Sequence, residues 1–385
     1  MKRLCALLLS AFLVLSLLAC GSQPAPEETQ PRQWHDAGTV SITKEQVETI
    51  VSMEFTTPKN VIIIIGDGMG ANDIELAEKH TEGVYDFGMV LNQIPHHGMC
   101  TTHSANNPVT DSAAAATALA TGVKTNNGYV GIDPEQRDLQ NMVELARNAG
   151  KKVGIVTDDL ITGGTPAGFV AHNISRNNDT ELERDIMAFG LDVLIGKYDY
   201  IHMMRSTKHG YNTANSVEEF QTVLESAEDL SKPFVGFNMG FTGEVSDDLS
   251  HCVQTALNLL KNDNGFFLMI ESSGTDKYGH KNMLDQKLPC VVNLDRTVAA
   301  VLLFMQENPD TLLVITSDHE TGGLQLPDGE LPPTNTLFTV TTHTETQVRV
   351  FALGQGSEYF QGKIVDNTDI AKFLQQAIIK APSAP

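Results

Sequence analysis

Ser112 begins an alanine-rich run and could present a nucleophilic hydroxyl to a phosphate group. The run is Asp111-Ser112 followed by four alanines, and it predicts a helix that starts at the serine. Unpaired backbone N–H groups and the positive end of the helix dipole gather at a helix start, and both favour an anionic ligand. A serine before alanines is also typical of a simple N-cap. The other residues that could do chemistry must decide between these interpretations.

Charged residues follow three apolar runs that predict buried strands. Asp67 follows residues 60–66, Glu271 follows residues 265–270, and the pair Asp318-His319 comes just after residues 311–316. A single acid after a strand is often a helix cap. A parallel sheet, however, binds ligands beyond the carboxyl ends of its strands. Three ends of this kind therefore indicate a common site.

The residue types at these ends predict metal ions. Asp276 and His280 are four residues apart, so one helical turn would place them on the same face as a pair of ligands. Asp318-His319 is a second pair of this kind, and His343 stands alone on a late loop. Carboxylate and imidazole together suit zinc, whereas an all-oxygen set suits magnesium. The candidate oxygen ligands are Asp67, Glu271 and a threonine hydroxyl.

Arg176 is the candidate for phosphate binding. It ends the stretch TPAGFVAHNISR, which begins at Thr165. A guanidinium group can bind two phosphate oxygens at once, and Asp111 beside the serine could hold it in place. A surface arginine after a loop is the alternative.

The elements that must position these residues alternate between strands and helices. The pattern predicts one α/β fold of three layers, with a largely parallel central sheet and helices on both faces. Residues 200–245 and 326–336 have the weakest periodicity and are expected to be small insertions near the active site. The predicted strands are 60–66, 97–102, 152–157, 193–195, 234–237, 265–270, 311–316 and 348–353. The predicted helices are 72–79, one from 112, 139–148, 181–189, 217–225, 248–261, 289–306 (with Pro289 in its first turn) and 369–380.

The N-terminal segment predicts export. Residues 1–19 have a basic start and an apolar run, as in a signal peptide. The stretch before Cys20 resembles the lipobox of bacterial lipoproteins, with an ordinary cleaved leader as the alternative. Residues 20–50 are then a lipidated N-terminus and flexible tether, and residues 51–385 a single catalytic domain. We expect a cell-envelope lipoprotein anchored at the outer face of the membrane.

Charge and cysteine content add two limits. The formal net charge is −22, which makes nucleic acid an unsuitable partner. Three cysteines remain beyond Cys20, namely Cys100, Cys252 and Cys290. A disulfide between Cys252 and Cys290 and a set of three buried thiols are both compatible with this number.

The chain resembles the metal-dependent alkaline phosphatases over about residues 60–355. The motifs that carry this resemblance occur in the order of the family: IGDGMG, VTDSAAAATALATGVKT, TPAGFVAH-x-x-x-R, E-x-x-x-x-D-x-x-x-H, TSDHETGG and H-T-x-x-Q-V. The resemblance implies an alkaline-phosphatase-like fold and hydrolysis of small phosphate monoesters through a phosphoserine, with two zinc ions and one magnesium ion. It also implies a homodimer.

The resemblance assigns a role to each candidate residue. Ser112 would be the nucleophile, Arg176 would bind the phosphoryl group, and Lys277 would reach phosphate or magnesium through water, with Asp111 beside the serine. One zinc ion would be held by Asp276, His280 and His343, the other by Asp67, Asp318, His319 and the Ser112 oxygen. Magnesium would be held by Asp67, Thr165 and Glu271.

One position departs from the family pattern. Many relatives carry an aspartate or histidine two residues before the threonine, where it supports the waters of magnesium, but this chain has Gly163. We therefore expect weaker magnesium binding or a changed pH optimum and turnover. No direct metal ligand is missing.

Two kinds of alternative function remain. A phosphodiesterase or sulfatase could be built on the same fold, but Ser112 lacks the C/S-x-P-x-R setting of sulfatases, and Arg176 suits a terminal phosphate. A lipoprotein that binds phosphate or metal without turnover is the other alternative, and it would have no need of a serine between two metals.

Overall fold

The computed structural model describes residues 40–81, 84–197, 209–213, 234–235, 249–327, 329 and 336–380. The strands are β1 (Asn60–Gly66), β2 (His96–Thr101), β3 (Lys152–Leu160), β4 (Val193–Lys197), β5 (Asn212–Thr213), β6 (Phe234–Val235), β7 (Phe266–Ser272), β8 (Thr311–Thr316), β9 (Glu320–Thr321), β10 (His343–Thr344), β11 (Val348–Leu353) and β12 (Ile364–Asp366). The helices are α2 (Lys44–Val51), α3 (Ala71–His80), α4 (Ser112–Thr121), α5 (Met142–Asn148), α6 (Gly164–Gly168), α7 (Asp179–Phe189), α10 (Leu249–Leu260), α11 (Gly274–Gly279), α12 (Leu284–Glu307) and α13 (Asn367–Lys380), with short 3-10 turns η1 (Leu91–Gln93) and η2 (Ser357–Phe360).

The predicted three-layer fold with a largely parallel sheet is confirmed. The large sheet has the strand order β12-β2-β11-β8-β1-β7-β3-β4-β6-β5. Strand β11 is antiparallel to both of its neighbours, β8 and β2, and the other pairs are parallel. A separate antiparallel pair, β9 and β10, lies outside this sheet.

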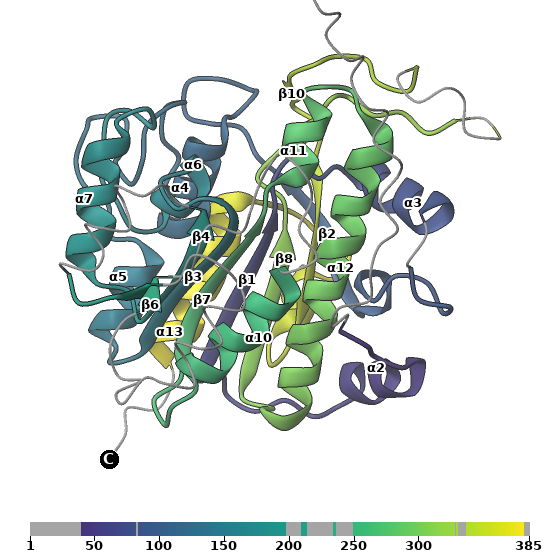
Figure 1. Ribbon diagram of the computed structural model, residues 1–385, viewed down its shortest axis with the longest axis horizontal. Coiled ribbons are helices and arrows are strands. Elements are labelled where there is room, and N and C mark those ends of the chain that lie inside the picture. The colour runs from purple at the N-terminus through teal and green to yellow at the C-terminus, as the bar shows by residue number, and fades with distance from the viewer. Residues whose placement is uncertain are drawn as a thin grey trace, which may run out of the picture. The chain divides into compact units, whose positions relative to one another are not determined.

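Strand β1 shows why the sheet is covered on both faces. Successive side chains of a strand point to opposite faces, and the fully buried residues of β1 divide between two apolar cores. Ile62 and Ile64 pack with α2, α3, α10 and α12, whereas Ile63 and Ile65 pack with α4, α5, α7 and α13. Figure 1 shows α10 and α12 in front of the strands and α13 behind them.

The folded part of the chain begins before residue 51, so the predicted tether of residues 20–50 is too long. Thr43 caps α2 in a reciprocal capping box with Gln46, which satisfies two free N–H groups at the helix start. Val47 and Ile50 of this helix are buried in the core. Residues 1–39, including Cys20, lie outside the described residues.

Helix α12 begins at Leu284, five residues before the predicted start at Pro289. Proline has no N–H to donate, so one carbonyl of the first turn loses its partner inside the helix. Burial of Leu284, Lys287 and Leu288 holds the additional turn in place. Within the described residues, α12 alone is long and apolar enough to cross a membrane, but 78% of its apolar stretch is buried in the fold, as expected for a core helix.

The remaining expectations have mixed outcomes. Cys100, Cys252 and Cys290 are buried and none of them forms a disulfide, so the alternative of three buried thiols is correct. The predicted insertion 200–245, with its helix 217–225, lies outside the described residues except for residues 209–213 and 234–235, which include β5 and β6. Most of the 326–336 loop lies outside them as well.

Candidate active site

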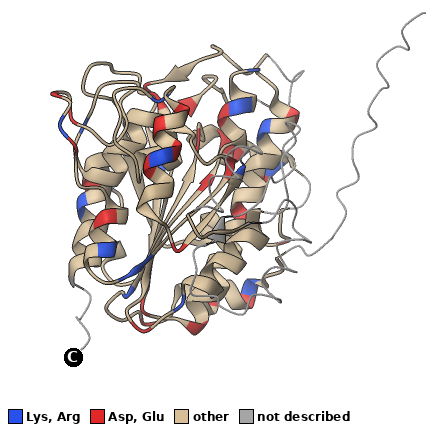
Figure 2. Cartoon of the chain, turned by 60° about the vertical axis from the view of Figure 1, so that its left-hand side comes forward, with Lys and Arg blue, Asp and Glu red and all other residues tan. Residues whose placement is uncertain are grey.

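Four neighbouring strands bring their carboxyl ends, and the polar residues that follow, into one row. The strands are β8, β1, β7 and β3, which are adjacent in the sheet. Asp318 lies just after β8 and Asp67 just after β1, while Glu271 and Asp158 lie at the ends of β7 and β3. In Figure 2 several acidic residues, drawn in red, gather at the upper end of the sheet where these strands end. The predicted meeting of the strand ends is confirmed.

Ser112 is the first residue of α4, and its hydroxyl is not used to cap the helix. The N-cap is Asp111, whose Oδ1 accepts a hydrogen bond of 3.0 Å from the Ala114 N–H. The N-cap interpretation of Ser112 is therefore wrong. Its Oγ lies 3.3 Å from His319 Nε2, and the residue is buried. The Ser112 hydroxyl is thus free of the helix cap and lies beside a histidine that is 207 residues away in the sequence.

Asp67, Asp318 and His319 form the first group of metal-ligand type. One donor atom from each lies within 4.8 Å of the others. His319 Nε2 is 3.1 Å from Asp318 Oδ2 and 3.6 Å from Asp67 Oδ1. Burial raises the pKa of Asp67 well above its usual range, and the charge of Asp318 raises it further. Two carboxylates so close together and so well buried require positive charge between them.

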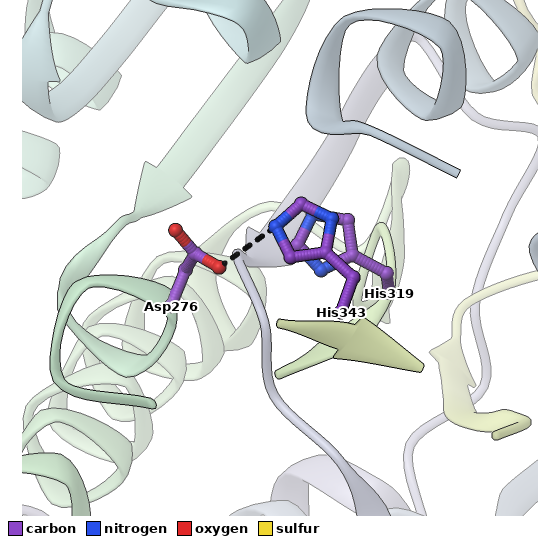
Figure 3. A group of neighbouring side chains, drawn as sticks. All are labelled: Asp276, His319 and His343. Atoms are coloured by element: carbon purple, nitrogen blue, oxygen red, sulfur yellow. Dashed lines mark ion pairs between the residues drawn. The ribbon is translucent and has the colours of Figure 1, made fainter. Parts of the chain in front are cut away.

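Asp276 is the centre of a second group with His319 and His343, shown in Figure 3. Its Oδ1 lies 3.3 Å from His343 Nε2 and also 3.3 Å from His280 Nε2. The two histidine Nε2 atoms are 3.2 Å apart. The structure therefore brings together the predicted set of Asp276, His280 and His343, and it places His319 of the first group directly beside them.

The pairing of β9 with β10 determines where His343 lies. His343 is opposite Thr321 in this antiparallel pair, and the rings of His343 and His319 are stacked with their centroids 3.5 Å apart. Burial lowers the pKa of His343, but the Asp276 carboxylate more than offsets this effect, and the pKa is raised overall. The second group therefore attracts positive charge as well.

Each of the three histidines has its Nδ1 occupied by a protein acceptor. Nδ1 of His280 lies 2.7 Å from the Thr341 carbonyl oxygen, and Nδ1 of His343 lies 2.9 Å from that of Thr110. A carbonyl can only accept a hydrogen bond, so both Nδ1 atoms are donors, and Nε2 is in each ring the nitrogen that could bind a metal ion.

The same reasoning applies to His319. The Thr321 hydroxyl donates to Asp276 Oδ1 at 2.6 Å, so its oxygen accepts from His319 Nδ1 at 3.2 Å. The Nε2 atoms of all three rings face the carboxylates. A histidine that donates from one ring nitrogen and leaves the other free is the usual form of a metal ligand.

An oxygen-rich group lies next to these residues. Glu271 is buried, and Thr157 donates a short hydrogen bond to its Oε2. Burial raises the pKa of Glu271 to about 8, with a further contribution from the charge of Asp159. Thr165 is the second residue of the short helix α6, lies beside this group and is buried too.

The unpaired atoms at the site fit metal ions. Asp67 Oδ1, Asp318 Oδ2 and Thr165 Oγ1 are buried and have no hydrogen-bond partner. A buried polar atom without a partner costs about 1–3 kcal/mol, and a bound cation would remove this cost. Nitrogen and oxygen donors in the two histidine groups suit zinc, and the oxygen donors around Glu271 suit magnesium.

Arg176 is held beside Ser112, as predicted, by Asp111. Arg176 Nη1 lies 3.1 Å from Asp111 Oδ2, and the Gly128 N–H donates to the same oxygen at 3.0 Å. Gly164 leaves room for the guanidinium, because a Cβ at this position would lie 2.8 Å from Arg176 Nη2. One cap residue therefore begins the serine helix and positions the arginine.

Lys277 is engaged by protein groups on the side of Glu271. Its Nζ lies 2.7 Å from Asp159 Oδ1 and donates to Ser273 Oγ at 2.9 Å.

Sequence reasoning missed Asp158 and Asp159, although they follow the predicted strand 152–157 directly. The signal that predicted the other site residues, a charged residue directly after an apolar run, is present here as well. Asp158 is buried and accepts from the Ser273 N–H at 2.6 Å.

Comparison with known proteins identifies the family to which this fold and this site belong. The alkaline phosphatase family model matches residues 58–205 and 236–337, and the chain belongs to this family. The alkaline phosphatase of Escherichia coli K12 is 26% identical over 407 residues, which cover 83% of this chain and 86% of that protein. The repressible alkaline phosphatase of Saccharomyces cerevisiae is 31% identical over 318 residues, covering 69% of this chain, but the chain spans only 55% of the length of that relative.

Solved structures agree with this family. The alkaline phosphatase from the Antarctic bacterium TAB5 has a TM-score of 0.73 and 28% sequence identity, with 86% of this chain and 100% of that chain covered. The Thermus thermophilus alkaline phosphatase has the same fold, with a TM-score of 0.73 at 21% identity over 88% of this chain and 95% of that chain.

Proposed function

We propose that the chain hydrolyses phosphate monoesters by two displacements at Ser112, with two zinc ions and one magnesium ion. One observation carries the proposal: Ser112 Oγ lies 3.3 Å from His319 Nε2, and His319 belongs to both groups of metal-ligand type. A serine held at the junction of two such groups suits a two-metal phosphoryl-transfer site. The family membership of the chain supports the same activity.

Three sets of residues are proposed as the metal ligands. One zinc ion would be held by Asp276, His280 and His343; the other by Asp67, Asp318, His319 and Ser112; and magnesium by Asp67, Thr165 and Glu271. When bound, these ions would supply Lewis-acid stabilisation for oxygen atoms that gain negative charge.

Ser112 and Arg176 have separate tasks in the proposed reaction. In the first displacement Ser112 Oγ loses its proton and bonds to phosphorus while the ester P–O bond breaks, and the departing alcohol oxygen gains a proton. In the second, a water oxygen loses a proton and bonds to phosphorus, while the Ser112 Oγ–P bond breaks and Oγ regains a proton, which releases phosphate. Arg176 binds two of the non-bridging oxygens, and the N–H groups at the start of α4 favour the same negative charge. Two displacements predict retained configuration at phosphorus.

A panel of three substrates tests the activity. The purified protein, supplied with zinc and magnesium, is assayed on p-nitrophenyl phosphate, bis-p-nitrophenyl phosphate and p-nitrophenyl sulfate. We expect the monoester to be hydrolysed at least about a hundredfold faster than the others, because Arg176 recognises a terminal phosphate. Faster cleavage of the diester or the sulfate would replace the proposal with the corresponding alternative. Bound metal without turnover of any substrate would indicate a binding protein.

We also propose that the protein is exported and attached to the membrane through a lipid on Cys20. The support is the apolar leader and the lipobox-like residues before Cys20. Radiolabelled palmitate fed to expressing bacteria should label the wild-type chain and leave Cys20→Ser unlabelled. Equal labelling of both chains would contradict the proposal. The homodimer implied by the family resemblance is tested by light scattering of the purified protein.

A further inference from the structure

Asp159 lies at the end of β3 and connects two parts of the oxygen-rich group. Its Oδ1 is 2.7 Å from Lys277 Nζ. Its backbone N–H donates to Thr157 Oγ1 at 2.9 Å, and Thr157 in turn donates to Glu271 Oε2. The side chain of Asp159 therefore holds the lysine, and its backbone fixes the hydroxyl that orients Glu271.

Lys277 is held from two sides. Besides the ion pair with Asp159, its Nζ donates to Ser273 Oγ at 2.9 Å. Ser273 is itself fixed through its N–H by the buried Asp158. This arrangement keeps the ammonium group close to Glu271 and gives it little freedom to move toward other acids.

The oxygen-rich group has the properties of a cation site. Thr165 Oγ1 is buried without a hydrogen-bond partner, and Glu271 is buried and accepts a hydrogen bond from Thr157. The Glu271 carboxylate and the Thr165 hydroxyl oxygen, together with Asp67, are hard donors that suit a hydrated magnesium ion.

No side chain at position 163 takes part in this arrangement. The Gly163 N–H donates to the Leu160 carbonyl oxygen at 2.8 Å in a tight turn, and a Cβ at this position would lie 2.9 Å from the same oxygen. A longer residue at 163 would press on the backbone. The acid that borders the group on this side of the chain is Asp159.

We propose that Asp159 is a positioning residue of the magnesium site, which holds Lys277 through its carboxylate and orients Glu271 through Thr157. The inference rests on the proposed function, because it assumes that Glu271 and Thr165 bind magnesium. Asp159 would then support the magnesium site in place of the aspartate or histidine that many relatives carry at the position of Gly163.

The test uses Asp159→Asn with a matched control. Asp192→Asn removes the acid of an Asp192–Arg147 pair of 3.0 Å whose side chains are 30% and 38% exposed, against 28% and 37% for Asp159 and Lys277. Magnesium affinity is measured by calorimetry on full-length, zinc-loaded protein, and zinc content by mass spectrometry. Asp159→Asn should bind magnesium about tenfold more weakly, with zinc content unchanged and with activity restored by excess magnesium. Asp192→Asn should bind magnesium like the wild type.

Two further variants make each outcome decisive. Asp159→Glu keeps the carboxylate and should recover most of the magnesium affinity, and Glu271→Gln should abolish binding. Wild-type affinity in Asp159→Asn together with lost binding in Glu271→Gln would overturn the inference and leave the proposed site intact. Wild-type affinity in Glu271→Gln would overturn the magnesium site itself. An activity loss in Asp159→Asn that excess magnesium does not restore would also overturn the inference.

Discussion

At the scale of single residues, Asp111 determines what Ser112 can do. Its Oδ1 caps α4, and its Oδ2 accepts from both Gly128 and Arg176. A serine that capped the helix itself would have its hydroxyl committed to a backbone N–H. Because Asp111 does the capping, the Ser112 hydroxyl faces His319, and Arg176, which we propose to bind phosphate, is held by the same aspartate.

Replacing Ser112 tests the covalent mechanism. Ser112→Ala should lose about a thousandfold or more of the monoesterase activity, since no other group can form the phosphoenzyme. Its melting temperature and zinc content should stay close to those of the wild type, because the cap residue is Asp111. Turnover of p-nitrophenyl phosphate at the wild-type rate would exclude a covalent serine intermediate.

Replacing Gly164 tests the position of Arg176 without changing its charge. In Gly164→Ala the new methyl group would lie 2.8 Å from Arg176 Nη2 and should displace the guanidinium. We expect inhibition by inorganic phosphate to weaken about tenfold, which is about 1.4 kcal/mol, and KM to rise.

The control for this variant is Gly168→Ala in the same short helix. Its methyl group would lie 2.8 Å from the Ala116 Cβ of α4, so it introduces a similar clash without touching the arginine. It should lower the melting temperature but change the phosphate inhibition constant little. Equal inhibition constants for Gly164→Ala and the wild type would show that Arg176 does not bind phosphate.

At the scale of elements, a buried ion pair connects α3 and α12 to the loop that carries the proposed metal ligands Asp318 and His319. Lys287 Nζ lies 2.8 Å from Asp73 Oδ1 and donates to the Thr321 carbonyl oxygen at 2.7 Å. Both charged side chains are 0% exposed. Thr321 in turn contacts Asp276 and His319 through its hydroxyl. The additional first turn of α12 is what brings Lys287 to this place.

Removing the lysine should destabilise the fold and the zinc site together. Lys287→Met leaves the Asp73 carboxylate buried without its cation, which costs about 3–5 kcal/mol, and Thr321 loses a donor. Denaturant unfolding measures the first effect and zinc titration the second. The double variant Asp73→Asn/Lys287→Met removes the buried charge and should regain part of the stability. A single variant as stable as the wild type would show that the pair does not hold these elements.

At the scale of the whole molecule, the pH dependence of stability has a contribution from outside the active site. Asp295 of α12 is buried and accepts hydrogen bonds from the Val90 and Leu91 N–H groups at the start of η1. Burial raises its pKa to about 7. The folded state therefore binds a proton more tightly than the unfolded chain. The stability from this group is fully present below about pH 4 and is lost as the pH rises to about 7.

The variant Asp295→Asn should remove this dependence. The free energy of unfolding of the variant minus that of the wild type should rise by about 2–4 kcal/mol between pH 4 and pH 8, because only the wild type loses stability over this range. The difference between the two proteins isolates Asp295, since proton and metal linkage elsewhere is common to both. Parallel stability curves over this range would show that Asp295 does not titrate as proposed.

The sequence alone determined most of the elements and the set of candidate residues. Residues 61–65 and 312–315 are short, unbroken apolar runs that contain β-branched side chains, and this pattern favours buried strands. Charged residues directly after these runs had to lie at the carboxyl edge of a parallel sheet. The motifs of the family supplied the rest, because they name residues by type and spacing and do not depend on knowing the contacts.

Tertiary structure alone decided how these residues are combined. Asp111 with Arg176, His343 with Thr321, and Lys287 with Thr321 are pairs of residues that are distant in the sequence. No local pattern encodes such pairs, because each depends on how strands and loops from different parts of the chain pack together. The capping of α4 by Asp111 instead of Ser112, and the contact of Asp159 with Lys277, were decided in the same way. The residue types limit the chemistry, and the packing of distant segments selects which residues act together.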